Sequence, residues 1–234
     1  MMSKKVLFAA LVAALSFTTV SMAAEPVISG NVSLDSRYDY RGVKYSDDAS
    51  LGLNLKADNL LIDGLYVSGT FNKVGDTAPF NAQSQIRSDL SVGYGFDITD
   101  KSSIDVSVAH VYNAPEFTHL HGNDVRNNGY SEFRVKGTYD VLFAEVGQAF
   151  GPWRSTYAKV GVSVPVTNSF NVGGAVSGVY YKGDHSSHYN NTEVFAKYNV
   201  TKSFDVYGKY SFGGKDMWNH SIGNYGTVGV SYNF

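Results

Sequence analysis

Histidines are the residues of this 234-residue chain whose spacing most resembles a metal site. His119 and His121 form a His-x-His pair, His185 and His188 form a His-x-x-His pair, and His220 follows in a later polar stretch. Imidazoles at such spacings can chelate zinc or copper, or they can titrate in mildly acid solution. Because histidines from different loops need not converge, spacing alone is a weak reason to infer a site. We expect no metal and no other cofactor, and keep these five residues only as weak metal candidates.

Serine and histidine stand close together once, in the stretch His185-Ser186-Ser187-His188. A serine activated by a histidine could hydrolyse lipid at the rim of a membrane barrel. This stretch is polar and contains no obvious third residue to orient the imidazole. We therefore expect no enzyme, and a barrel hydrolase is the least favoured alternative.

Charged side chains are the largest set with possible chemistry, because they recur at alternate positions of the expected strands. The candidates for lining a pore are Asp35, Arg37, Asp39, Arg41, Lys56, Arg87, Asp89, Asp105, Glu132, Arg134, Lys136, Glu145, Lys159, Glu193, Lys197, Asp205 and Lys209. Such interleaved charges can set a field across an open pore, or they can pair and close the interior. Both outcomes stay open, and the balance of signs predicts weak charge selectivity.

The step Arg41-Gly42 has two interpretations. Arg41 could be a cation at the pore mouth, with Asp39 or Asp35 as its partner. Alternatively, a strand ends here and turns into a loop, with Gly42 supplying the backbone freedom. We favour the turn, since a turn glycine needs no ligand.

The remaining alternate positions of the expected strands, those between the charged ones, are apolar. Aliphatic residues such as Leu34, Val108 and Val228 occupy these positions in the middle of the strands, and aromatic residues occupy them at the ends. A basic side chain facing lipid would cost about 2–4 kcal/mol at the bilayer midplane, so the charged parity must face inward. Aromatic girdles mark the headgroup boundaries of membrane barrels. We expect Tyr38 and Tyr40 in the outer girdle.

This alternation divides the chain into about twelve segments separated by turn residues. They are 27–41, 50–58, 65–73, 85–97, 103–112, 130–140, 142–150, 153–164, 170–181, 190–200, 204–212 and 223–234. Starting from a periplasmic amino terminus, the even-numbered connections are short. The odd-numbered ones include the long polar stretches 43–49, 74–84, 113–129, 182–189 and 213–222. This asymmetry is typical of transmembrane barrels, so we predict an all-β fold: an antiparallel up-and-down β-barrel of about twelve strands.

Three of the short turns share a pattern of threonine, one or more polar residues, serine and an apolar residue. They begin at Thr99, Thr167 and Thr201. Threonine hydroxyls in turns can hydrogen-bond their own backbone, so we expect the same turn chemistry to repeat in three hairpins.

Both ends of the chain predict its compartment. Lys4 and Lys5 precede an apolar run, 6–20, and a small-x-small cleavage site ends at Ala23. This pattern predicts a signal peptide over 1–23 and a barrel over 24–234. The terminal strand ends on an aromatic residue, Phe234, as bacterial outer-membrane barrels do. We expect export through the periplasm to the outer membrane, with lipid and, through this strand, the barrel-assembly machinery as partners.

Composition excludes several classes of protein. The chain has no cysteine, which argues against a disulfide framework and a lipidated cysteine. Its formal net charge of −2 argues against nucleic acid as a partner.

Three segments resemble the TorF-type porin family, a group of small Gram-negative outer-membrane barrel proteins. The first is Val32-Ser33-Leu34-Asp35-Ser36-Arg37-Tyr38-Asp39-Tyr40-Arg41-Gly42-Val43-Lys44-Tyr45-Ser46-Asp47. The others are Leu65-Tyr66-Val67-Ser68-Gly69-Thr70 after Asp63-Gly64, and Tyr130-Ser131-Glu132-Phe133. The resemblance implies an outer-membrane barrel called a porin by analogy, and it implies no particular substrate.

The function expected from the sequence is a channel for passive diffusion of small hydrophilic solutes. The alternative is a non-conducting barrel whose external loops bind a partner or a metal ion.

Overall fold

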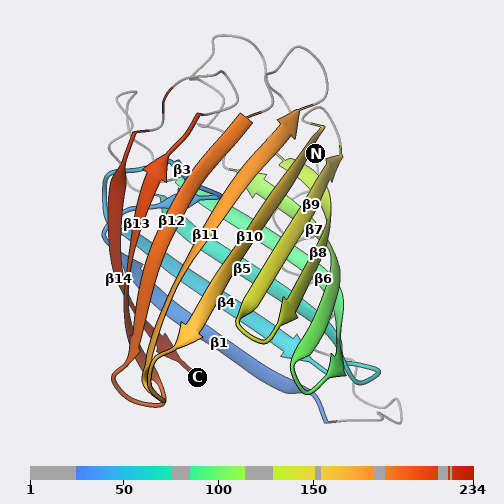
Figure 1. The fold of residues 1–234 in the computed structure, drawn as a ribbon. Helices are drawn as coiled ribbons and strands as arrows, with labels where there is room; N and C mark the ends of the chain where they lie inside the picture. Colours follow the sequence, from blue (N-terminus) through green and yellow to red (C-terminus); the bar gives the residue numbers. More distant parts are fainter. Residues whose placement is uncertain are drawn as a thin grey trace.

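The computed structural model describes residues 25–74, 85–113, 129–150, 154–181, 188–215, 221 and 223–234. Within these ranges no helix is long and apolar enough to cross a membrane. The described chain forms a closed antiparallel barrel of tilted strands (Figure 1). The twelve barrel strands are β1 (Val27–Asp35), β4 (Ser50–Asp58), β5 (Leu65–Val74), β6 (Gln85–Thr99), β7 (Ser102–Asn113), β8 (Gly129–Tyr139), β9 (Leu142–Phe150), β10 (Ser155–Pro165), β11 (Phe170–Tyr181), β12 (His188–Asn199), β13 (Phe204–Gly213) and β14 (Tyr225–Asn233).

Each barrel strand pairs with the strands before and after it, and β1 closes the ring by pairing with both β4 and β14. The predicted all-β antiparallel barrel is therefore confirmed. The strand ends agree with the predicted segments within two residues in all cases but the first. This agreement follows from the period-2 pattern, which changes where a strand gives way to turn residues.

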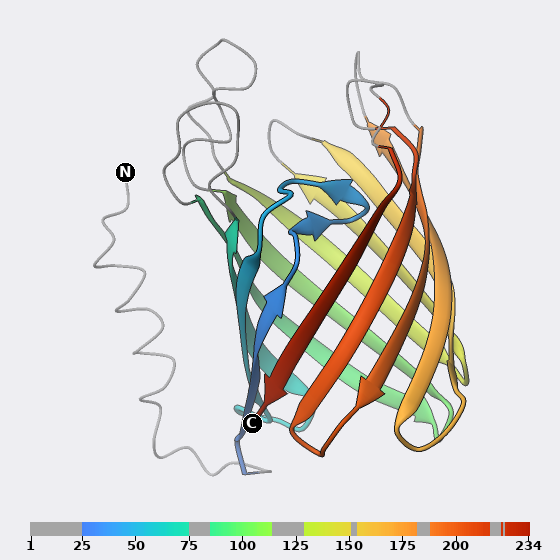
Figure 2. The same ribbon diagram turned by 90° about the vertical axis from the view of Figure 1, so that its left-hand side faces the viewer.

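The first predicted segment, 27–41, is wrong in its second half. β1 ends at Asp35, and the chain then leaves the barrel wall. Residues 36–49 carry a separate two-stranded hairpin, β2 (Asp39–Tyr40) and β3 (Val43–Lys44), which we call the lumen hairpin. It lies near the upper rim in Figure 2. The stretch 43–49 is therefore not an external loop.

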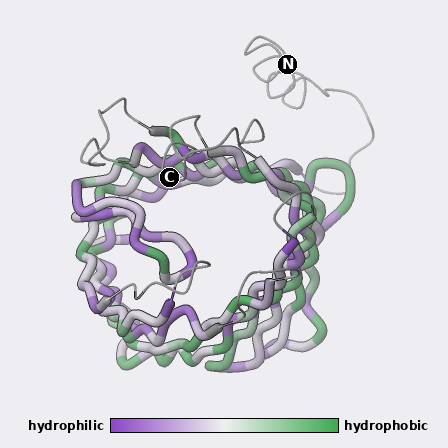
Figure 3. Tube along the Cα trace, turned by 90° about the horizontal axis from the view of Figure 1, so that it is seen from above, coloured by the Kyte–Doolittle hydropathy of each residue, from purple (hydrophilic) through white to green (hydrophobic). Residues whose placement is uncertain are grey.

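The lumen hairpin projects inside the ring of strands, where Figure 3 shows a described segment crossing part of the barrel interior. Its side chains and backbone contact Glu132 of β8, Asn190 of β12 and Lys209 of β13. β12 and β13 are neighbours, whereas β8 is separated from them by β9, β10 and β11, so the hairpin contacts two separate parts of the wall. Alternation alone could not reveal this, because β2 and β3 are also extended and continue the same period.

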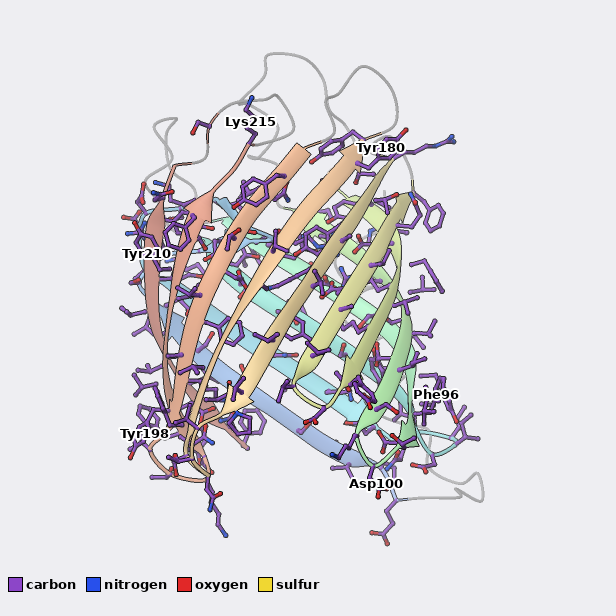
Figure 4. All side chains as sticks on the ribbon, in the orientation of Figure 1. Phe96, Asp100, Tyr180, Tyr198, Tyr210 and Lys215 are labelled. Carbon is purple, nitrogen blue, oxygen red and sulfur yellow. The ribbon has the colours of Figure 1, made fainter. Side chains whose placement is uncertain are left out.

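The outer surface of the barrel is apolar, as predicted. Leu34, Val108 and Val228 are 52%, 57% and 65% exposed. Aromatic residues lie at both rims: in Figure 4, Tyr180 and Tyr210 are near the upper rim, and Phe96 and Tyr198 are near the lower rim. This is the profile of a surface that faces a bilayer.

Tyr38 and Tyr40 do not belong to the outer girdle, so that prediction is wrong. Both residues lie in the lumen hairpin, and Tyr38 is only 8% exposed. Their rings do not lie on the outer surface, because the chain turns into the lumen after Asp35. The aromatic-x-aromatic pattern could not show on which side of the wall the rings lie.

The repeated turn chemistry is confirmed. The hydroxyl of Thr167 accepts hydrogen bonds from the backbone N–H of Ser169 and of Phe170. Thr201 makes the same pair of contacts in its turn, and Thr99 accepts from the backbone N–H of Lys101. These contacts satisfy backbone donors that the strand ladders leave unpaired.

Candidate functional site

The structure divides the candidate charged residues between the barrel wall and the lumen hairpin. Asp35 is the last residue of β1, and Arg37, Asp39 and Arg41 lie in the lumen hairpin. The wall carries the rest: Lys56, Arg87, Asp89, Asp105, Glu132, Arg134, Lys136, Glu145, Lys159, Glu193, Lys197, Asp205 and Lys209.

Cross-strand register brings opposite charges together on the wall. Lys136 of β8 lies opposite Asp105 of β7 on one side and Glu145 of β9 on the other. Glu145 is in turn opposite Lys159 of β10. Since directly paired residues point to the same face of a sheet, these charges form one continuous band.

The tip of the lumen hairpin is a two-residue turn. Tyr40 pairs with Val43, and the two residues between them, Arg41 and Gly42, have φ of 53° and 79°. Positive φ at both central positions is the geometry of the tightest β-hairpins. Arg41-Gly42 is therefore a turn, as favoured, but it joins β2 to β3 and does not end a strand of the wall.

The turn packs against β12. The side-chain nitrogen of Asn190 donates to the carbonyl oxygen of Arg41 at 3.1 Å. A methyl group on Gly42 would lie 2.3 Å from the side chain of Asn191. Gly42 thus serves both a left-handed backbone and a close approach to the wall. Neither Asn190 nor Asn191 is among the candidate site residues predicted from the sequence.

Arg41 anchors the hairpin to β8, a second part of the wall. Its guanidinium donates to both carboxylate oxygens of Glu132, at 2.6 and 2.8 Å, and lies 3.6 Å from Glu145. Glu132 also accepts from Arg134 at 2.6 Å, and Arg134 donates twice to Asp89, at 3.1 and 2.6 Å. The partner of Arg41 is therefore Glu132, and not Asp39 or Asp35 as hypothesised.

Aromatic rings cover this network of guanidinium groups and carboxylates. The guanidinium carbon of Arg87 lies 3.6 Å from the centre of the Tyr40 ring, and that of Arg41 lies 4.2 Å from the centre of Tyr157. Such stacking stabilises a cation that burial has desolvated. Burial raises the pKa of the Tyr40 hydroxyl well above its usual range. The sequence could have assigned Tyr157 to the lumen, because it lies two residues from Lys159 and so points to the same face of the strand.

The other side of the hairpin is attached to β13 and β14. Lys209 donates to Asp39 at 2.5 Å, and the hydroxyl of Thr227 donates to the same carboxylate at 3.2 Å. At the base of the hairpin, Asp47 accepts from Lys44 at 2.8 Å and lies 3.4 Å from Arg37. The hydrogen bond from Lys44 lowers the pKa of the Asp47 carboxyl. The hairpin is therefore held by charge pairs at its tip, side and base.

Two cavities adjoin this arrangement. One of about 470 Å³ lies between the hairpin and strands β12 and β13. The other, of about 500 Å³, lies by the turns at 168–169 and 199–202. Lys197 lines both cavities, so they share one stretch of wall.

Ion pairs continue along the wall beside these cavities. Lys159 pairs with Glu193 at 2.5 Å, and Lys197 pairs with Asp205 at 2.7 Å. The interior thus combines cavities with neutralised charges, which is intermediate between the two outcomes that the sequence left open.

The histidine and signal-peptide predictions lie mostly outside the described residues. This applies to His119, His121, His185, His220 and 1–23, and His188 is described only as part of the β12 backbone. Among the described residues, no group of three or more possible metal ligands comes together.

The fold is a small closed antiparallel barrel of twelve described strands, an architecture shared with solved outer-membrane porins. The KdgM porin is similar to this chain with a TM-score of 0.58 and 14% identity, covering 88% of this chain and 99% of KdgM. The NanC porin has a TM-score of 0.55 and 11% identity, covering 88% and 99%. An outer membrane channel from Pseudomonas putida F1 has a TM-score of 0.51 and 13% identity, covering 93% and 99%.

At these identities the likeness shows a shared fold. No protein-family model and no curated protein sequence matches the chain.

Proposed function

We propose that this chain is a channel of the bacterial outer membrane through which small hydrophilic solutes diffuse passively. The observation that carries the proposal is the sorting of side chains in the described barrel: apolar residues outside, and charged residues around cavities inside. The fold shared with porins supports it. Export by a signal peptide over 1–23 and membership of the TorF-type family belong to the same proposal.

In this proposal the lumen hairpin forms the constriction of the channel. Polar wall residues replace part of the hydration that a solute loses on entering a narrow lumen. Because the charges that line the cavity balance and several are paired, as in Lys209 with Asp39 and Lys197 with Asp205, the passage carries little net field. Weak selectivity between cations and anions follows.

Single-channel recording in a planar bilayer tests the proposal. The refolded protein should give steady currents, with a reversal potential near zero in a KCl gradient. Lys136→Glu changes the inner charged band and should shift the reversal potential toward cation selectivity. Lys101→Glu, in an exposed turn at the rim, is the matched control and should leave it unchanged.

Two results would contradict the proposal. A well-folded barrel that stays silent would favour the non-conducting alternative, in which external loops bind a partner. A strong preference for one ion sign in the wild-type protein would contradict weak selectivity.

A further inference from the structure

Two aromatic rings lie flat on the lumen wall because the residue opposite each of them is a glycine. Phe195 of β12 pairs with Gly173 of β11, and a methyl group at Gly173 would lie 2.3 Å from the ring. Tyr207 of β13 pairs with Gly229 of β14, where a methyl group would lie 2.6 Å from the ring. A side chain at either glycine would push the ring off the wall and into the lumen.

Both rings line the cavity of about 470 Å³ beneath the lumen hairpin. Since one face of each ring covers a glycine, the opposite face is turned to the cavity. The hydroxyl of Tyr207 donates to Asp35 at 2.6 Å, which fixes the orientation of that ring. The cavity therefore has two rigid, electron-rich flat surfaces on its wall.

The formal charges that line this cavity balance, with Asp35, Asp39 and Glu193 against Arg37, Lys197 and Lys209. Lys209 is paired with Asp39, Lys197 is paired with Asp205, and Glu193 is paired with a lysine of β10. These groups keep hydrogen-bonding capacity, because each ammonium has three donors and each carboxylate several acceptor sites. An anionic solute, in contrast, would have to compete with a carboxylate that is already paired with each cation of the lining.

We propose that this cavity binds a neutral sugar ring; the inference rests on the proposed channel function and names its solute class. The C–H groups on one face of a sugar ring carry partial positive charge and would stack on the face of Phe195 or Tyr207. The hydroxyl groups would bond to Lys197, Lys209 and Glu193, which line the same cavity. A volume of this size suits a small ligand held by flat apolar contacts and a few polar groups.

Binding to the protein in detergent micelles, measured by isothermal titration with glucose, tests the inference without requiring ion conduction. Glucose should bind, and sorbitol, which has hydroxyl groups but no ring face, should bind about tenfold more weakly. Phe195→Ala should weaken glucose binding by about tenfold, and Phe195→Trp should keep it. Phe143→Ala is the matched control, since Phe143 covers Gly161 but does not line this cavity.

Equal binding of glucose and sorbitol, or unchanged glucose binding by Phe195→Ala, would overturn the inference. So would glucuronate binding more tightly than glucose, because it would mean that a free cation dominates the site. In bilayers, glucose should reduce the open-channel current of the wild type and not that of Phe195→Ala. Conduction without glucose binding would contradict only the proposed sugar site. Glucose binding by a barrel that does not conduct would contradict only the proposed channel.

Discussion

At the scale of single residues, Glu132 is the centre of the lumen network. Its side chain is 1% exposed and accepts from two guanidinium groups, those of Arg41 and Arg134. Breaking a buried ion pair by neutralising one member leaves the other charge uncompensated. The Glu132 carboxylate therefore determines both the position of the lumen hairpin tip and the local charge balance of the wall.

Glu132→Gln should lower the free energy of unfolding by about 2–4 kcal/mol, because two buried cations lose their common anion. Guanidinium unfolding of the barrel in micelles measures this change, and the open-channel conductance should rise as the hairpin loosens. Lys101→Ala is the control, since its 3.9 Å contact with Asp140 joins two exposed side chains. Equal losses of stability in the two variants would contradict a central role for Glu132.

Asp47, at the base of the lumen hairpin, should make the hairpin sensitive to acid. Its pKa is lowered by the hydrogen bond from Lys44 and by the nearby Arg37. A carboxyl whose pKa is lower in the folded protein stabilises the fold above its unfolded pKa, and this contribution is lost as the pH falls through the lower folded value. The effect should be small, because the Asp47 side chain is 61% exposed.

Conductance measured as a function of pH tests whether the hairpin is destabilised by acid, as the lowered pKa of Asp47 predicts. The wild-type current should rise only in strongly acid solution, below the ordinary pKa range of an aspartate. Asp47→Asn should show the acid-state conductance already at neutral pH. A rise that begins near pH 6 in both proteins would point to a different group.

At the scale of elements, the lumen hairpin is an extended segment that could have continued the wall and instead crosses the interior. Its tip requires a left-handed backbone at Arg41 and Gly42 and a close fit of Gly42 to Asn191. Its tip is tied to β8 and its side to β13 by ion pairs. The element is therefore positioned by contacts with distant strands, and the two residue pairs of its own ladder contribute little.

Gly42→Ala should displace the hairpin tip. The added methyl group would meet Asn191 at 2.3 Å, so the tip must move away from β12 and the conductance should change. Gly223→Ala is a matched control, because Gly223 has a similar φ of 73° but no described atom within 4 Å of its added methyl group. Both variants carry the backbone strain of about 1 kcal/mol, and only Gly42→Ala should alter the current. Identical currents would show that the tip contact does not shape the passage.

At the scale of the whole molecule, the barrel closes along a short seam. β1 pairs with β14 through Asn31–Asp35 alone, whereas the whole of β1 pairs with β4. Phe234 extends the seam, since its N–H and C=O both bond to Gly30 at 3.0 Å. Its ring also covers Gly30, where a methyl group would lie 2.8 Å from it.

Deletion of Phe234 should reduce refolding into micelles, because the seam loses two backbone hydrogen bonds, each worth about 1 kcal/mol. Phe234→Ala keeps both bonds and should refold nearly as well as the wild type. We propose that the barrel-assembly machinery reads the aromatic side chain of Phe234, so that Phe234→Ala should still reduce the amount assembled in cells. The folded fraction, followed by gel migration of unheated samples, measures both effects; equal assembly of Phe234→Ala and wild type in cells would contradict that recognition.

The sequence by itself determined the barrel wall. Alternation tells which side chains share a face, and turn residues tell where strands end, since both are local properties of an extended chain. This is why the strands, the apolar outer face and the threonine turns agree with the structure. It is also why Tyr157 and Tyr207 could have been assigned to the interior from the parity of Lys159 and Lys209.

Only the tertiary structure decided where residues 36–49 go and what Arg41 contacts. A period of two continues unchanged whether an extended segment stays in the wall or folds into the lumen, because both are β structure. The choice depends on partners that are distant along the chain: Glu132 lies 91 residues from Arg41, and Lys209 lies 170 residues from Asp39. Such pairings exist only after the barrel has closed and brought those strands around a common interior.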